Sequence, residues 1–143
     1  MNKRIVLLII LVLIVIAAVY LLKCNTKDKP VQLPAFSLQG SSEINYGEIG
    51  FKIWDNEAED GDTVRVYLDG KLVRDTLGLL NQPLELNFGK LSKGTHQLGV
   101  EAINEGSSAP ATASIGLTSG EQTTEFIMNA TLDRAASWTI IIK

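Results

Sequence analysis

The chain has 143 residues, of which 45% are hydrophobic and 20% are charged, and this length allows one folded domain and little more. The net charge of −3 is uneven, because residues 1–34 carry five basic side chains against one acidic side chain, while residues 35–143 carry eight against fifteen. An acidic domain without a stripe of Lys and Arg is a poor match for nucleic acid, whose phosphates dominate such binding. Nucleic acid is therefore excluded as an expected partner.

The N-terminal part contains a long apolar run. Residues 5–22, "IVLLIILVLIVIAAVYLL", include no charged side chain. As a helix this run would span roughly 27 Å, close to the ~30 Å hydrocarbon core of a bilayer. We therefore expect a cytoplasmic basic tail at 1–4, a transmembrane signal anchor at 5–22, and a single-pass membrane protein.

Two other interpretations of this run stay open. A cleaved signal peptide would use Val15 and Ala17 before its cleavage site, although the apolar run continues for five residues beyond Ala17. A lipoprotein would carry its lipid on Cys24, although Lys23 stands directly before it where a small residue is expected. Because Cys24 is the single cysteine, no intramolecular disulfide can form.

A polar segment at 23–34 follows, with prolines at positions 30 and 34. It is typical of an extended linker. A short basic tail before a long apolar run is the common layout of a signal anchor whose folded domain lies on the far side of the membrane. We therefore expect the domain at 35–143 to face the periplasm or the cell exterior.

The hydrophobic residues of this domain recur at every second position, which predicts strands. The alternating runs are 64–68, 84–88, 98–102, 113–117, 126–132 and 138–142. Asp69 and Gly70 join two runs through a two-residue turn, the typical signal of a type I′ hairpin. The pattern predicts an all-β, antiparallel, Ig-like β-sandwich of seven or eight strands.

Three stretches carry a resemblance: "WDNEAEDGDTVRVYLDGKLV", "EAINEGSSAPATA" and "ASWTIIIK". Together they resemble a small Ig-like β-sandwich module of secreted and envelope proteins of the Bacteroidota. The resemblance implies a location outside the inner membrane and implies no reaction. One departure is "APATA" at 109–113, where the module has Pro-Pro-Asn-Thr-Ala.

An acidic loop precedes the predicted hairpin, and its five carboxylates are the candidate metal ligands: Asp55, Glu57, Glu59, Asp60 and Asp62. Calcium takes six to eight oxygen ligands, so the residue types suit it, although the EF-hand spacing is absent. Asp, Asn and Gly also form ordinary solvated turns. A calcium site, a solvated turn and a charged partner surface all remain open.

Catalytic patterns are missing. His96 is the single histidine, and the sequence contains no Gly-x-Ser-x-Gly, His-Glu-x-x-His or phosphate-binding loop. With one His and one remote Cys, a zinc site is not expected either. We predict a protein that is not an enzyme and that uses no cofactor other than a possible calcium ion.

These observations predict a membrane-tethered, extracytoplasmic, non-enzymatic module of the cell envelope that binds a protein partner or acts as an accessory. The candidate partner-binding residues lie on the hairpin and are Arg65, Tyr67, Lys71 and Arg74. The alternative is a carbohydrate-binding module, assisted by calcium. Two or more exposed, coplanar aromatic rings among Tyr46, Trp54 and Tyr67 would favour a glycan ligand.

Overall fold

The computed structural model describes residues 3–24, 33–55, 57 and 59–143. The chain forms two units, residues 1–32 and 33–143. The first contains helix α1 (Lys3–Cys24), whose described side chains are those of Lys3 and residues 10–19. Within the described residues, no helix is long and apolar enough to cross a membrane. The signal anchor expected at 5–22 therefore gains no support from the structure, and residues 25–32 of the expected linker lie outside the described residues.

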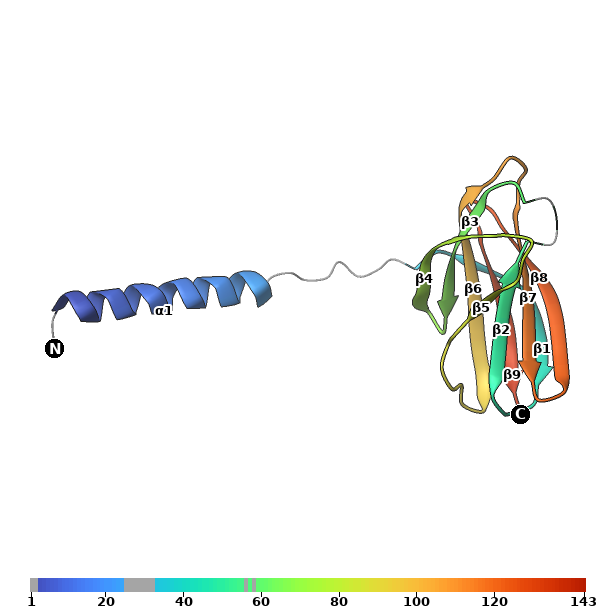
Figure 1. Ribbon diagram of the computed structural model, residues 1–143, viewed down its shortest axis with the longest axis horizontal. Coiled ribbons are helices and arrows are strands. Elements are labelled where there is room, and N and C mark those ends of the chain that lie inside the picture. The colour runs from blue at the N-terminus through green and yellow to red at the C-terminus, as the bar shows by residue number, and fades with distance from the viewer. Residues whose placement is uncertain (1–2, 25–32, 56, 58) are drawn as a thin grey trace. The chain divides into compact units, whose positions relative to one another are not determined.

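The second unit consists of two β-sheets (Figure 1). The five-stranded sheet has the order β1-β9-β6-β3-β4, with β1 at Phe36–Ile44, β9 at Ala135–Ile142, β6 at Gly94–Glu105, β3 at Asp62–Leu68 and β4 at Lys71–Gly78. The four-stranded sheet has the order β5-β2-β7-β8, with β5 at Leu84–Leu86, β2 at Ile49–Trp54, β7 at Ala111–Ser119 and β8 at Gln122–Ala130. The all-β, two-sheet architecture is confirmed, whereas its Ig-like character stays a prediction.

Two details of the predicted sandwich were wrong. The described residues form nine strands rather than seven or eight. The sheets are also not wholly antiparallel, because β1 pairs in parallel with β9, from Phe36 opposite Ala135 to Ile44 opposite Ile142. The sequence of β1, "FSLQGSSEI", lacks the alternation that marks the other strands, which explains why the sequence did not reveal it.

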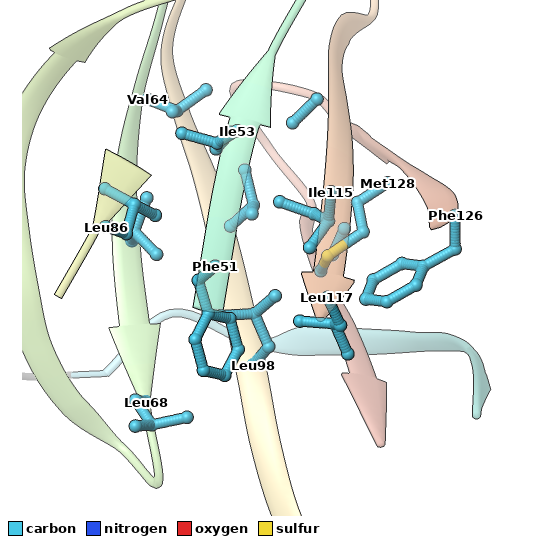
Figure 2. Close-up of a cluster of buried hydrophobic side chains, with 14 of the residues drawn as sticks. Phe51, Ile53, Val64, Leu68, Leu86, Leu98, Ile115, Leu117, Phe126 and Met128 are labelled. Carbon is cyan, nitrogen blue, oxygen red and sulfur yellow. The ribbon is translucent and has the colours of Figure 1, made fainter. Parts of the chain in front are cut away.

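The core lies between the two sheets, where buried side chains from both sheets meet (Figure 2). Ile53 of β2, Ile115 of β7 and Met128 of β8 come from one sheet, and Val64 of β3 and Leu98 of β6 come from the other. All five are at most 1% exposed. Because complete burial of such a side chain contributes roughly 1.5–3 kcal/mol, this cluster holds the sheets together.

The two open sides of the sandwich differ. On one side, the side-chain amide of Gln39 in β1 donates to the carbonyl of Asn129 in β8 at 2.7 Å and accepts from its N–H at 2.9 Å. Gln122 of β8 likewise donates to the carbonyl of Glu43 and accepts from the N–H of Asn45. Two glutamines thus satisfy part of the main chain between edge strands β1 and β8. On the other side the edge strands are β4 and β5.

Candidate functional site

The β3–β4 hairpin forms as the sequence predicts. Asp69 and Gly70 have φ angles of 51° and 74°, the positive values that a type I′ turn requires at both central positions. The turn places Lys71 and Arg74 on β4, where both side chains are exposed. The other two candidate partner-binding residues, Arg65 and Tyr67, lie on β3.

Arg65 and Tyr67 meet at one carboxylate. The Tyr67 hydroxyl donates to Glu101 of β6 at 2.6 Å, and the Arg65 guanidinium lies 3.5 Å from the same Glu101 oxygen. Arg65 also donates to Asp75 of β4 at 2.8 Å. Burial and the bond to Glu101 together raise the pKa of Tyr67 to about 12. This network fixes the outer face of the hairpin against β6.

Tyr67 is 4% exposed, although its place on β3 is on the outer face of the sheet. The ring of Phe36 covers it edge-on, with the ring centroids 5.4 Å apart. Phe36 reaches this position by lying against Gly99 of β6, where any Cβ atom would collide with its ring. Tyr67 therefore positions Glu101 and offers no free surface to a partner.

The accessible part of the hairpin is a surface on β4 that consists of Lys71, Leu72, Val73 and Arg74, called the β4 surface below. Leu72 and Val73 are 43% and 36% exposed. Seven of the eight residues of β4 are exposed, and the eighth, Leu77, is half-buried. Leu72 pairs with Tyr67 on the outer face of the sheet. Lys71 and Arg74 instead pair with core-facing residues of β3, so the β4 surface extends around the edge of the sheet and does not lie on one face.

The acidic loop at the opposite end of β3 brings together three of its five carboxylates. One oxygen each from Asp55, Asp60 and Asp62 lies within 4.8 Å of the others. Gly61 adopts a φ of 102°, which glycine reaches far more readily than other residues, and the bend allows its two neighbours to join one cluster. Asp55 and Asp62 are buried, and Asp60 is half-buried.

The two glutamates of the loop stand apart from this cluster. Glu57 is exposed, and its main-chain N–H donates to Asp55 Oδ1 at 2.9 Å. Glu59 is exposed and accepts from the N–H of Asn81 at 3.1 Å. Of the five predicted metal ligands, the structure thus brings three together and assigns the other two to the surface.

The three aspartates influence one another electrostatically. Burial raises the pKa of Asp62, the hydrogen bond from the N–H of Thr112 opposes that shift, and the nearby charges of Asp60 and Asp55 add to it. The net pKa shift is upward. A cation at this position would relieve the like-charge repulsion.

Both ring nitrogens of His96 form hydrogen bonds within the fold. Its Nδ1 lies 2.7 Å from Asp69 Oδ2 and its Nε2 lies 2.9 Å from the carbonyl of Ser92. Both neighbours are acceptors, so the protonated ring, which donates from both nitrogens, satisfies them together. Burial lowers the pKa of His96, but the bonds to Asp69 and Ser92 outweigh it, and the net shift is upward.

The aromatic residues that would favour a glycan ligand do not share one surface. Tyr46 is 43% exposed, whereas Tyr67 is buried and Trp54 is half-buried against Gly116 of β7. Tyr46 lies beneath the ammonium groups of Lys90 and Lys93, at 5.7 and 5.4 Å from its ring centroid. These three aromatics therefore do not supply a platform of two exposed rings.

The lipidation candidate, Cys24, is the last residue of α1, and its side chain lies outside the described residues.

Comparison with known proteins found no match to the chain among family models, curated proteins or solved structures. The resemblance to the Bacteroidota module therefore stays a prediction from the sequence.

Sequence reasoning missed the residues that organise the acidic loop from a distance. Asp60 Oδ2 accepts hydrogen bonds from the N–H groups of Ser107 and Ser108, at 2.9 and 2.8 Å. Asp62 Oδ2 accepts from the N–H of Thr112 at 3.0 Å. These partners follow the acidic loop by about fifty residues, and their main-chain groups carry no sequence signal.

Proposed function

We propose that this chain is a non-enzymatic binding module of the cell envelope that contacts a protein partner through the β4 surface. The observation that supports the proposal most strongly is the exposure of β4, an edge strand on which every side chain except that of Leu77 is exposed. Leu72 and Val73 supply apolar contact area, and the adjacent Lys71 and Arg74 supply positive charge. A partner with an apolar patch bordered by carboxylates would complement this surface.

The geometry of the edge favours contact through side chains rather than the addition of a strand. The pairing of β3 with β4 shifts register between Val64 and Val66 and again between Val66 and Tyr67. Such irregularities twist an edge, and charged side chains on it discourage continuous pairing with another strand. We therefore expect the partner to contact the side chains of the β4 surface and not to add a strand to the sheet.

The proposed location rests on the N-terminal sequence. Residues 5–22 contain no charged side chain. We propose that this segment tethers the module to a membrane, with residues 33–143 on the periplasmic or exterior side. The non-enzymatic assignment is supported by His96, whose two ring nitrogens are both occupied within the fold.

A matched pair of photo-crosslinking sites tests the partner surface. A benzophenone side chain would replace Leu72 on β4 in one protein and Ile127 on β8 in another, since both residues are 43% exposed. The native membrane fraction would then be irradiated and analysed by mass spectrometry. We expect a discrete crosslinked protein from position 72 and none from position 127.

Charge reversal provides the control. Lys71→Glu combined with Arg74→Glu should abolish the crosslink from position 72, because the proposed partner is acidic. Equal labelling from positions 72 and 127, or labelling that survives the charge reversal, would contradict the β4 surface as the binding site.

A further inference from the structure

Each of the three clustered aspartates of the acidic loop has one carboxylate oxygen without a hydrogen-bond partner among the described residues. Each carboxylate uses one oxygen within the chain: Asp55 Oδ1 accepts from Glu57, Asp60 Oδ2 accepts from Ser107 and Ser108, and Asp62 Oδ2 accepts from Thr112. The second oxygen of each carboxylate is buried and makes no hydrogen bond among the described residues. Each of the three carboxylates therefore has one hydrogen-bonded oxygen and one buried oxygen without a partner.

Because the free oxygens are buried, water cannot readily supply the hydrogen bonds that they lack. Asp55 is 2% exposed and Asp62 is 3% exposed, so water has little access to either carboxylate. A buried ionised carboxylate is costly unless it is paired, hydrogen-bonded or bound to a metal. An ordinary solvated turn would leave its carboxylates in water, as Glu57 and Glu59 are here.

The spacing of the three carboxylates fits a single ion. Oxygens that bind one calcium ion at about 2.4 Å lie no more than about 4.8 Å apart, which is twice the bond length. One oxygen from each aspartate satisfies this limit, since all three lie within 4.8 Å of one another. Their hydrogen bonds to the main chain hold the carboxylates in place before an ion arrives.

The donor atoms select the class of metal. All three ligating groups are carboxylates, and the cluster includes neither His nor Cys. Oxygen ligands favour calcium or magnesium over zinc and copper. Magnesium requires a near-ideal octahedron and gives up its waters reluctantly, whereas calcium accepts irregular protein sites with several carboxylates.

We propose that Asp55, Asp60 and Asp62 bind one calcium ion, with main-chain carbonyls or water supplying the remaining ligands. The ion would join the end of β2, the β2–β3 loop and the start of β3, which are the positions of the three aspartates. Through Ser107 and Ser108, which bond to Asp60, it would also fix the loop between β6 and β7. This inference does not depend on the β4 surface.

The test measures calcium binding to the purified full chain in mild detergent, after removal of metals with EDTA. Native mass spectrometry should show one calcium ion per chain, and titration calorimetry should show saturable binding in the presence of 1 mM magnesium. The matched variants are Asp60→Asn, Asp62→Asn and Glu57→Gln, each of which removes one negative charge from the loop. The first two should weaken binding about tenfold or more, because affinity follows the number of charged ligands, while Glu57→Gln should change it less than about twofold.

Two results would overturn the proposed calcium site. Absence of bound calcium in the unaltered chain would overturn the proposal, as would equal affinities in all three variants. Circular dichroism in EDTA would identify a variant that fails to fold, and the native mass of the unaltered chain decides the question even if both Asp variants fail.

Discussion

An aspartate lies at each end of β3, and the two carboxylates differ in the number of their oxygens that accept hydrogen bonds from the chain. Asp69, just beyond the last residue of the strand, accepts hydrogen bonds at both oxygens, from the N–H of Gln97 and from His96. Asp62, the first residue, has one buried oxygen without a partner. At one end of the strand the chain thus supplies its own counter-charge, whereas at the other end a cation from solution would complete the site.

The pKa shifts of the two residues follow the same contrast. Burial raises the pKa of Asp69, but the hydrogen bonds from His96 and Gln97 outweigh it, and the net shift is downward. A lowered pKa means that ionised Asp69 stabilises the fold above the ordinary value of 3.8, and that this contribution is lost as the pH falls through the folded-state pKa. The pKa of Asp62 is raised, so without a cation its ionised form destabilises the fold.

Calcium should change the free energy of unfolding more than any of the substitutions below. At a concentration of 100 times the dissociation constant, the ion should raise the free energy of unfolding by about 2.7 kcal/mol. Thermal unfolding of the full chain, followed by circular dichroism with calcium and then with EDTA, measures this change. A melting temperature that is the same in both buffers would remove the distinction between the two ends of β3.

Neutral substitutions at the two aspartates should differ in their effect on the free energy of unfolding in calcium-free buffer. Asp69→Asn should lower the free energy of unfolding by about 1 kcal/mol, because it removes the charged partner of His96 while Asn still tolerates the positive φ of the turn. Asp62→Asn should leave it unchanged or raise it, because it removes a repelled charge and keeps an acceptor for Thr112. Urea unfolding of both variants tests the signs, and a loss of stability at position 62 larger than at position 69 would contradict them.

The Asp69 end should respond to mild alkali. Because the pKa of His96 is raised, its contribution is complete below the ordinary value of 6.5 and is lost as the pH rises through the folded-state pKa. The melting temperature in EDTA should therefore fall as the pH rises above about 6.5. His96→Gln should flatten this slope, and an equally steep slope in the variant would assign the dependence to another group.

The smallest effect is expected outside the cluster. Glu57→Gln should change the free energy of unfolding by less than about 0.5 kcal/mol with or without calcium, as is usual for an exposed side chain away from structural contacts. Chemical denaturation in the two buffers provides the measurement. A large change would place Glu57 among the residues that hold the ion.

Much of the fold could be predicted from the sequence because most strands bury one face. The alternation of Val64, Val66 and Leu68 identified β3 correctly, and all three side chains are buried. Strand β1 was not identified, because its pairing with β9 leaves several small and polar residues half-buried or exposed. Local patterns report which face of a strand is buried, and they do not report which distant strand becomes its neighbour.

The candidate sites were predicted less completely, for a related reason. The sequence identified five carboxylates in one loop, but the convergence of three of them depends on Ser107 of the β6–β7 loop and Thr112 of β7, about fifty residues away. Tyr67 was expected on an exposed hairpin face, and its burial depends on Phe36 crossing Gly99. In both cases tertiary contacts determine which of the identified residues are accessible.

A crystal structure of residues 33–143, grown with calcium and measured at an energy where calcium scatters anomalously, would show directly whether the three aspartates bind an ion. We expect one anomalous peak at the start of β3, about 2.3–2.6 Å from one oxygen each of Asp55, Asp60 and Asp62. A map without that peak, in which ordered water or a side chain donates to the three free oxygens, would contradict the proposed calcium site.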